Sequence, residues 1–386
     1  MKSELFGKKL IIYAEGRITS DNVSDVQEEF IGICKANEYE NLEFNLNKLE
    51  YISSAGLRML LKIKKLEKSF VLTEVNNEVY DIFETTGFSS ILDIQRVMRE
   101  VSIDGCKMIG DGFYSEVYRL DPEKIIKVYV NNTTLDDIKR ELDLAKQAFL
   151  KGVPTAISYD VVKVNDKYGV VFEMISSGSL KNAILNAPDK LDYYIKMYAD
   201  LVRTINATEV GDFVLPKARE KYISKLDDIK DYISKEDYGK ILSMLSQVPD
   251  DSTYCHGDCH IKNIMIGDGD LLLIDMDTLS SGSVLFEFAG MYTAYCGYPL
   301  FDHNNIMEFF GVEYELVQRI YSGVTRLYFE GITDEAYERN CDRIMLTSYI
   351  DMIRRMKVIY NDEDRMAKYY DELKKVLSRV DTLIFE

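Results

Sequence analysis

The chain has 386 residues, enough for two or three domains, and its 46% hydrophobic residues, with 11% aromatic residues, can fill real cores. A net charge of −18 argues against a nucleic-acid partner, because binding to a phosphate backbone needs a basic face. The sequence shows no membrane span and no signal peptide, and its six cysteines lack paired spacing, so we expect a cytoplasmic protein without a membrane partner.

Short apolar strands and amphipathic helices alternate over the first hundred residues. The strands read as alternating or continuous apolar runs, and the helices carry apolar side chains at helical spacing. This alternation predicts a domain over residues 1–100 with a small mixed sheet and helices on one face. The predicted strands are residues 10–14, 42–46 and 70–72, and the predicted helices are residues 23–36, 57–66 and 79–86.

A short polar turn precedes the second of these helices. It reads Ile-Ser-Ser-Ala-Gly-Leu over residues 52–57, so the hydroxyl of Ser53 or Ser54 should cap the helix. This turn and the order of the elements resemble the STAS domain, the fold of anti-sigma-factor antagonists. The resemblance implies a protein partner and a phosphorylated switch serine. Counted back from Gly56, that serine is Ser54, and Ser53 stands where the family has an Asp.

A glycine-rich loop opens the second part of the chain. Residues 109–118 read Ile-Gly-Asp-Gly-Phe-Tyr-Ser-Glu-Val-Tyr and lie between two predicted strands. Glycines let the backbone approach phosphate groups closely, and exposed N–H groups can then bind the phosphate oxygens. Gly110 and Gly112 are therefore candidate nucleotide-binding residues.

A lysine lies inside the next predicted strand. Lys127 interrupts the apolar run of residues 124–129, and a charged side chain at such a place either reaches solvent or has a partner. Another apolar strand, residues 170–175, ends in a Ser-Ser-Gly-Ser segment. The rest of the chain is mainly helical. The predicted helices are residues 193–206, 222–245, 317–329, 343–360 and 363–383.

Two segments of the helical part carry the strongest chemical signal. Residues 255–263 read Cys-His-Gly-Asp-Cys-His-Ile-Lys-Asn, and residues 271–277 read Leu-Leu-Leu-Ile-Asp-Met-Asp. The Gly-Asp-Gly-Asp sequence between them predicts a hairpin of two short strands. Such a hairpin would bring Asn263 and Asp275 back to one end, beside Asp258. One base and two oxygen ligands suit phosphoryl transfer with magnesium.

Two features of this region have alternative interpretations. Cys255, His256, Cys259 and His260 could bind zinc, but their spacing is not a usual zinc arrangement and no second Cys/His pair lies nearby. The aromatic residues of segment 292–301 could line a pocket for an acceptor molecule or belong to the core.

The His256-Gly257-Asp258 segment with its hairpin resembles the catalytic segment of aminoglycoside phosphotransferases and choline kinases. In this branch of the protein-kinase-like fold, His-Gly-Asp replaces the His-Arg-Asp of protein kinases, and no Phe-Gly follows the second Asp. The resemblance implies a bilobal domain over residues 101–386, with a small β-rich lobe to about residue 175 and a helical lobe from about residue 176. It implies Asp258 as the catalytic base, and Asn263 and Asp275 as the ligands of Mg²⁺.

The same resemblance implies roles for the remaining candidates. Lys127 would bind the α- and β-phosphates of ATP. Glu141 on the following helix would be its partner, with Asp143 and Glu116 as alternatives. Ser115 stands where the protein-kinase loop has its third Gly, so it would bind the nucleotide together with Gly110 and Gly112. The adenine would bond to main-chain groups near Glu173 and Ile175. His256 would brace the catalytic loop, and Asp277 would support the site from just behind the metal.

Together these expectations predict an ATP- and magnesium-dependent phosphotransferase that acts on a hydroxyl of a small molecule and is coupled to a regulatory STAS domain. No Ala-Pro-Glu triplet follows Asp275, which favours a small acceptor over a protein. Two alternatives stay open. The chain could be a protein kinase that phosphorylates Ser54 of its own or another copy, or a nucleotide-sensing module without catalysis.

Overall fold

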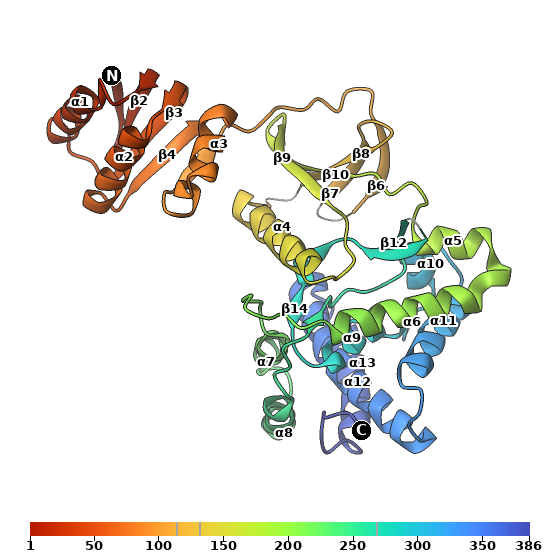
Figure 1. Cartoon of the computed structure of the whole chain (residues 1–386). Helices are drawn as coiled ribbons and strands as arrows, with labels where there is room; N and C mark the ends of the chain where they lie inside the picture. Colours follow the sequence, from red (N-terminus) through yellow and green to blue (C-terminus); the bar gives the residue numbers. More distant parts are fainter. Residues whose placement is uncertain (113–114, 131–132, 268) are drawn as a thin grey trace. The chain divides into compact units, whose positions relative to one another are not determined.

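The computed structural model describes residues 1–112, 115–130, 133–267 and 269–386. Phe113 and Tyr114 of the glycine-rich loop and Asp268 of the predicted hairpin turn lie outside the described residues. The chain divides into two compact units (Figure 1). One comprises residues 1–102 with 161–165, and the other comprises residues 103–160 with 166–386.

The first unit contains a five-stranded mixed sheet in the order β1-β2-β3-β4-β5. Strand β1 pairs antiparallel with β2, and the other neighbours pair parallel, which confirms the predicted mixed sheet. The sequence did not predict β1 or β5, because every residue of β1 is exposed and leaves no alternation to detect. The strands are β1 (Lys2–Phe6), β2 (Lys9–Ile18), β3 (Asn41–Ile52), β4 (Phe70–Val75) and β5 (Ile94–Arg96).

Three α-helices cover one face of this sheet. Strand β2 buries every second residue, such as Leu10 and Ile12, and these side chains share one apolar cluster with Phe30 and Leu60 of the helices. Ser53 is the N-cap of α2, since its side chain accepts a hydrogen bond from the Gly56 N–H at 3.4 Å. The helices are α1 (Val23–Lys35), α2 (Ser54–Leu66), α3 (Asn77–Thr85) and the short 3₁₀ helix η1 (Phe88–Ser90).

A five-stranded sheet in the order β6-β7-β8-β10-β9 follows the first hundred residues. Its strands belong to the second unit, except that residues 161–164 of β9 are grouped with the first. Strands β6, β7, β8 and β10 pair antiparallel in that order. One helix, α4 (Leu135–Leu150), follows β8, and Thr134 caps its first turn in a reciprocal hydrogen-bonded arrangement with Asp137. The strands are β6 (Lys107–Asp111), β7 (Ser115–Arg119), β8 (Lys124–Tyr129), β9 (Ser158–Val164) and β10 (Lys167–Glu173).

The remainder of this unit is a helical lobe around two small two-stranded sheets. The helix expected over residues 222–245 is two helices, because the chain turns before Ser234, whose side chain caps α8 through the Asp237 N–H at 3.0 Å. The α-helices are α5 (Leu180–Asn186), α6 (Leu191–Ala207), α7 (Ala218–Asp228), α8 (Lys235–Gln247), α9 (Val284–Tyr292), α10 (Asn304–Phe310), α11 (Tyr314–Tyr328), α12 (Asp334–Arg355) and α13 (Glu363–Leu377). The short helical turns are η2 (Pro188–Lys190), η3 (Met276–Thr278), η4 (Thr293–Gly297) and η5 (Met356–Tyr360).

The predicted hairpin lies between these helices. Strands β12 (Ile264–Gly267) and β13 (Asp270–Leu273) pair antiparallel, with Ile264 opposite Leu273. The Ile274 N–H donates to the Asn263 carbonyl at 2.9 Å and extends this pairing by one step. Asn263 and Asp275 therefore leave the hairpin at the same end. The other small sheet pairs β11 (Tyr254–Cys255) with β14 (Ser280–Ser281).

None of the described helices has the length and apolar character that crossing a membrane requires.

Gly56→Ala should destabilise the first unit. A Cβ at this position would lie 2.6 Å from Ile52 Cγ1 and 2.8 Å from Ile18 Cγ2, and such overpacking costs about 1–3 kcal/mol. The matched control is Gly32→Ala in α1, where a Cβ meets nothing within 4 Å and the better helix propensity of Ala should add up to about 1 kcal/mol. Urea denaturation of the full chain measures both, and equal stabilities of the two variants would contradict this packing.

Candidate active site

The ammonium group of Lys127 joins three elements of the second unit. Its Nζ lies 2.9 Å from Glu141 Oε1 on α4 and 2.9 Å from Asp275 Oδ1 after β13. Burial works to lower the pKa of Lys127, but the Asp275 and Glu141 carboxylates outweigh it and hold that pKa above its usual range. Burial likewise works to raise the pKa of Asp275, and Lys127 holds it below its usual range instead. Lys127 and Asp275 therefore both stay charged.

Tyr129 completes the partners of Glu141 and was not singled out from the sequence. Its hydroxyl donates to Glu141 Oε2 at 2.9 Å, so both carboxylate oxygens of Glu141 are engaged. Tyr129 follows Lys127 by two residues in β8, and alternate residues of a strand lie on one face. This spacing is the signal that could have identified it.

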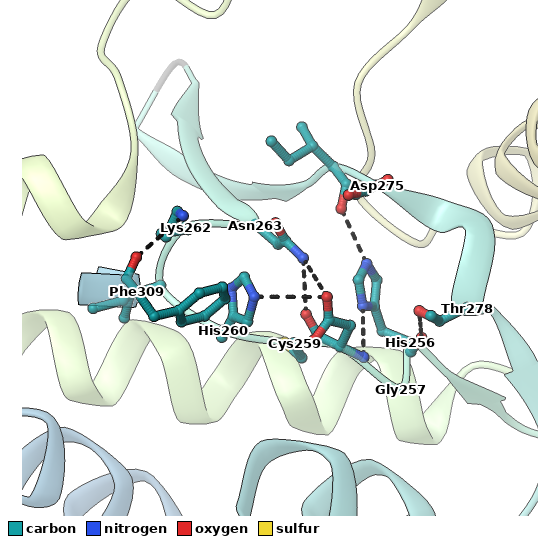
Figure 2. A network of polar contacts seen from close by, with 12 residues as sticks. His256, Gly257, Cys259, His260, Lys262, Asn263, Asp275, Thr278 and Phe309 are labelled. Atoms are coloured by element: carbon teal, nitrogen blue, oxygen red, sulfur yellow. Dashed lines mark hydrogen bonds and ion pairs between the residues drawn. The ribbon is translucent and has the colours of Figure 1, made fainter. Parts of the chain in front are cut away.

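His256 connects the turn that carries Asp258 to the strand that leads to Asp275 (Figure 2). Its Nδ1 accepts from the Asp258 N–H at 3.2 Å, and its Nε2 lies 3.1 Å from the Ile274 carbonyl oxygen. Burial lowers the pKa of His256, which favours the neutral ring. With Nδ1 accepting, the single ring proton is on Nε2, where it donates to the carbonyl.

Asp258, Asn263 and Asp275 meet at this end of the hairpin. The Asn263 side-chain amide donates to the Asp258 carbonyl at 3.1 Å and to Asp258 Oδ2 at 3.0 Å. Asn263 is buried, whereas the Asp258 side chain is 42% exposed and open to another molecule. Asp275 has a φ of 66°, a left-handed conformation that costs free energy for a residue other than Gly.

The oxygens of Asn263 and Asp275 suit Mg²⁺. The Asn263 amide nitrogen is used by Asp258, which leaves its amide oxygen for another partner, and Asp275 keeps Oδ2 beside its bond to Lys127. Magnesium is usually held by one or two such groups together with phosphate oxygens and water. In the described part of the chain, no group of three or more His, Cys, Asp or Glu side chains could hold a metal ion. Cys255 Sγ donates instead to the Gly282 carbonyl at 3.2 Å.

The glycine-rich loop begins at Gly110 in β6 and returns through Ser115 in β7. The Gly112 N–H donates to the Ser115 carbonyl at 2.9 Å and closes the turn. A Cβ on Gly110 would lie 3.3 Å from Val117, so the two strands approach closely here. The role of this loop in nucleotide binding stays a prediction.

The side chains of the expected adenine-binding segment have contacts of their own. Glu173 accepts from the Ile157 N–H at 2.7 Å, and Ile175 is buried. A main-chain contact of adenine with these two residues stays a prediction.

Asp277 lies two residues beyond Asp275, in η3. Burial, and then the nearby Asp275 and Glu141 carboxylates, raise the pKa of Asp277 above its usual range. The Asp277 carboxyl therefore lies close enough to Asp275, Glu141 and Lys127 to interact with their charges. Its supporting role is also untested.

Glu287 on α9 fixes the backbone of the turn that carries Asp258, and sequence reasoning missed it. Its carboxylate is fully buried on α9 and accepts from the His256 N–H at 2.5 Å and the Gly257 N–H at 3.2 Å. Burial raises the pKa of Glu287 to about 7. The signal was a single charge inside the apolar run of residues 284–289, the same kind of signal that singled out Lys127.

Two tyrosines fix the loop between Asp258 and Asn263. The Tyr198 hydroxyl donates to the Cys259 carbonyl, and the Tyr295 hydroxyl accepts from the Ile261 N–H at 2.8 Å. Tyr295 is fully buried, so within segment 292–301 the core interpretation is correct for this residue. Phe301 in the same segment is partly exposed.

Two family models match this chain. Residues 3–101 match the STAS domain, and residues 105–306 match the phosphotransferase enzyme family. Among curated proteins, BtrV of Bordetella bronchiseptica, described as a candidate anti-sigma factor antagonist, is 32% identical over 89 residues. This match covers 22% of the present chain and 76% of BtrV.

Solved structures of small-molecule kinases are also similar. An ADP-bound aminoglycoside phosphotransferase, APH(2'')-Ib, is 15% identical with a TM-score of 0.48, over 78% of this chain and 99% of its own. A choline/ethanolamine kinase family protein from Mesorhizobium loti is 13% identical with a TM-score of 0.47, over 72% of this chain and 92% of its own. Because these identities and TM-scores are low, the assignment of this chain to a family rests on the family models.

Glu287→Gln should change how stability depends on pH. The folded-state pKa of Glu287 is raised from 4.5 to about 7, so the native state favours its neutral form. This difference adds about 3 kcal/mol to the free energy of unfolding below about pH 4.5. The contribution is lost as the pH rises from there through about 7. Wild type should lose this amount relative to Glu287→Gln in urea denaturation across that interval. Parallel pH profiles of the two proteins would contradict the assignment.

Proposed function

The chain belongs to the phosphotransferase enzyme family and carries a STAS domain before it, and from this premise we propose that it transfers the γ-phosphate of ATP to a hydroxyl of a small molecule. The observation that carries the proposal is the meeting of Asp258, Asn263 and Asp275 at one end of the β12–β13 hairpin, with Lys127 bonded to Asp275. The proposal places the domain boundary near residue 100 and the division between the lobes near residue 175.

Nucleotide binding would use the groups around Lys127. Its ammonium is permanently charged and already fixed by Glu141, so it can bind the α- and β-phosphates without further ordering. Main-chain N–H groups near Gly110 and Ser115 would lie over the phosphates, and main-chain groups near Glu173 and Ile175 would bond the adenine.

Asn263 and Asp275 would hold Mg²⁺, with Asp277 supporting them. When bound, the metal neutralises charge on the phosphates and on the transferred group. If a cation bound Asp275, the Lys127 ammonium would lose its contact with Asp275 and keep only its contact with Glu141. It would then be available to the nucleotide. In this account the ion pair between Lys127 and Asp275 belongs to the nucleotide-free protein.

Asp258 would act as the base for the acceptor hydroxyl. Its carboxylate is exposed enough to reach another molecule, and its turn is fixed by the His256 ring and by Glu287. It takes the hydroxyl proton as the oxygen attacks the γ-phosphorus, while the bond from the γ-phosphorus to the β,γ-bridging oxygen breaks and ADP leaves with that oxygen. Fixing the base before the substrate arrives avoids a reorganisation cost during the reaction.

One observation favours a second candidate function, the phosphorylation of Ser54 by this chain or another copy. Because Ser53 takes the capping role in α2, Ser54 is the first residue of the helix and is exposed. A phosphate at a helix N-terminus is stabilised by the free N–H groups there.

Asp258→Asn should abolish turnover without abolishing nucleotide binding. The change keeps the size of the side chain and removes the proton acceptor, so ADP formation with a panel of hydroxylated metabolites should fall at least about 100-fold. Asp189→Asn, at an exposed acid in η2, is the control and should behave as wild type. Full activity of Asp258→Asn would contradict the proposal.

Intact mass after incubation with ATP and Mg²⁺ separates the two candidate functions. A gain of one phosphate that is absent in both Asp258→Asn and Ser54→Ala would favour the protein kinase. An unchanged mass, together with ADP formation on a metabolite, supports the small-molecule phosphotransferase.

Gly290→Ala should lower the rate of ADP formation by displacing the turn that carries Asp258. A Cβ at Gly290 would lie 2.4 Å from the Gly257 carbonyl oxygen, so the backbone next to Asp258 must move. A displacement of about 1 Å at a catalytic group costs about 100-fold in rate. The control is Gly239→Ala in α8, where a Cβ meets nothing within 4 Å. Comparable ADP formation by the two variants would show that the turn tolerates the shift.

A further inference from the structure

His260 lies beside the proposed base and has no part in the account so far. Its Nε2 is 3.6 Å from Asp258 Oδ2, and Figure 2 shows its ring between the Phe309 side chain and the turn. The His260 side chain is only 5% exposed, whereas the Asp258 side chain is 42% exposed. We propose that His260 is a positioning residue that orients the Asp258 carboxylate. This inference rests on the proposed function.

The His260 ring is held in place from several sides. The rings of Phe309 and Phe310 meet it edge-on, with centroids 5.3 Å and 5.5 Å away. The His260 carbonyl accepts from the Asn263 N–H at 2.8 Å, and the residues on either side of His260 are bonded to Tyr198 and Tyr295. The ring cannot turn away from Asp258 without unpacking α10 from the loop.

The two oxygens of Asp258 have different surroundings. Oδ2 accepts from the Asn263 amide at 3.0 Å and faces His260 Nε2. Within the described ranges, no hydrogen bond or ion pair reaches Oδ1. The terminal torsion of an Asp is soft, so contacts on one oxygen decide where the other points. Asn263 and His260 together therefore leave Oδ1 as the oxygen that takes the hydroxyl proton.

The state of the other ring nitrogen supports a role for this contact. His260 Nδ1 is buried and has no hydrogen-bond partner in the described part of the chain. A buried polar atom without a partner costs free energy, and an apolar side chain would avoid that cost. The polar group that Nε2 faces is Asp258. At 3.6 Å the contact is longer than a hydrogen bond, and such catalytic contacts commonly tighten when substrate binds.

The competing explanation is that His260 only packs against its neighbours. Variants with side chains of different length distinguish packing from the orientation of Asp258. His260→Gln places an amide nitrogen near the position of Nε2, whereas the amide of His260→Asn stops near the position of Nδ1 and falls short of Asp258. Both variants bury one amide, so their effects on packing should be similar. His303→Asn is the control, because His303 is exposed and stacks on Tyr314. His260→Leu, which buries no polar group, is measured if both amide variants unfold.

The test is ADP formation from ATP and Mg²⁺ with water as acceptor, together with the KM for ATP and the thermal midpoint. His260→Asn should lower kcat about 10- to 100-fold with an unchanged KM, and His260→Gln should recover most of this loss. Equal kcat values for His260→Asn and His260→Gln, or a wild-type kcat for His260→Leu, would overturn the role of His260. Wild-type turnover that does not depend on Asp258 would overturn the proposed function and this inference with it.

Discussion

The candidate active site depends most on the two ion pairs of the Lys127 ammonium group. They join a strand of the small lobe to helix α4 and to the end of the β12–β13 hairpin, each over 2.9 Å. The Lys127 side chain is 15% exposed and that of Glu141 is 10% exposed, so solvent screens this pair weakly. Removing one member of a buried pair leaves a charge without compensation and costs about 3–5 kcal/mol. The two lobes therefore share one electrostatic centre, and any cation that binds Asp275 must compete with Lys127.

The turn that carries Asp258 is held by groups of a different kind. Glu287 accepts two backbone N–H groups inside the core, and the neutral His256 ring joins the turn to the end of β13. Gly290 lets α9 come so close to Gly257 that no side chain fits between them. None of these groups needs to touch a substrate. Their effect is to fix the position of Asp258 before substrate arrives, which is where preorganised sites gain their rate.

The parts of this site that are local in sequence could be predicted, and the parts that depend on distant packing could not. The hairpin could be derived from its turn residues. The lysine inside an apolar strand indicated either solvent contact or a partner, and the family resemblance implied that this partner is on the next helix. Glu287 is 31 residues from His256, and nothing in the local spacing links the two. Strand β1 was missed because it is exposed throughout, and the break before α8 was missed because the apolar pattern continues across it. His260 was considered only as a zinc ligand, since its orientation toward Asp258 depends on α10, more than 40 residues further along the chain.

We propose that Lys127 and Asp275 exchange their mutual ion pair for contacts with ATP and Mg²⁺. Calorimetric titration of the full chain with ATP, with and without Mg²⁺, tests this most directly when wild type is compared with Asp275→Asn. We predict that Mg²⁺ strengthens ATP binding to wild type at least about tenfold, which is about 1.4 kcal/mol, and has little effect on the variant. An equal magnesium effect in both proteins, or no ATP binding by wild type, would contradict the account.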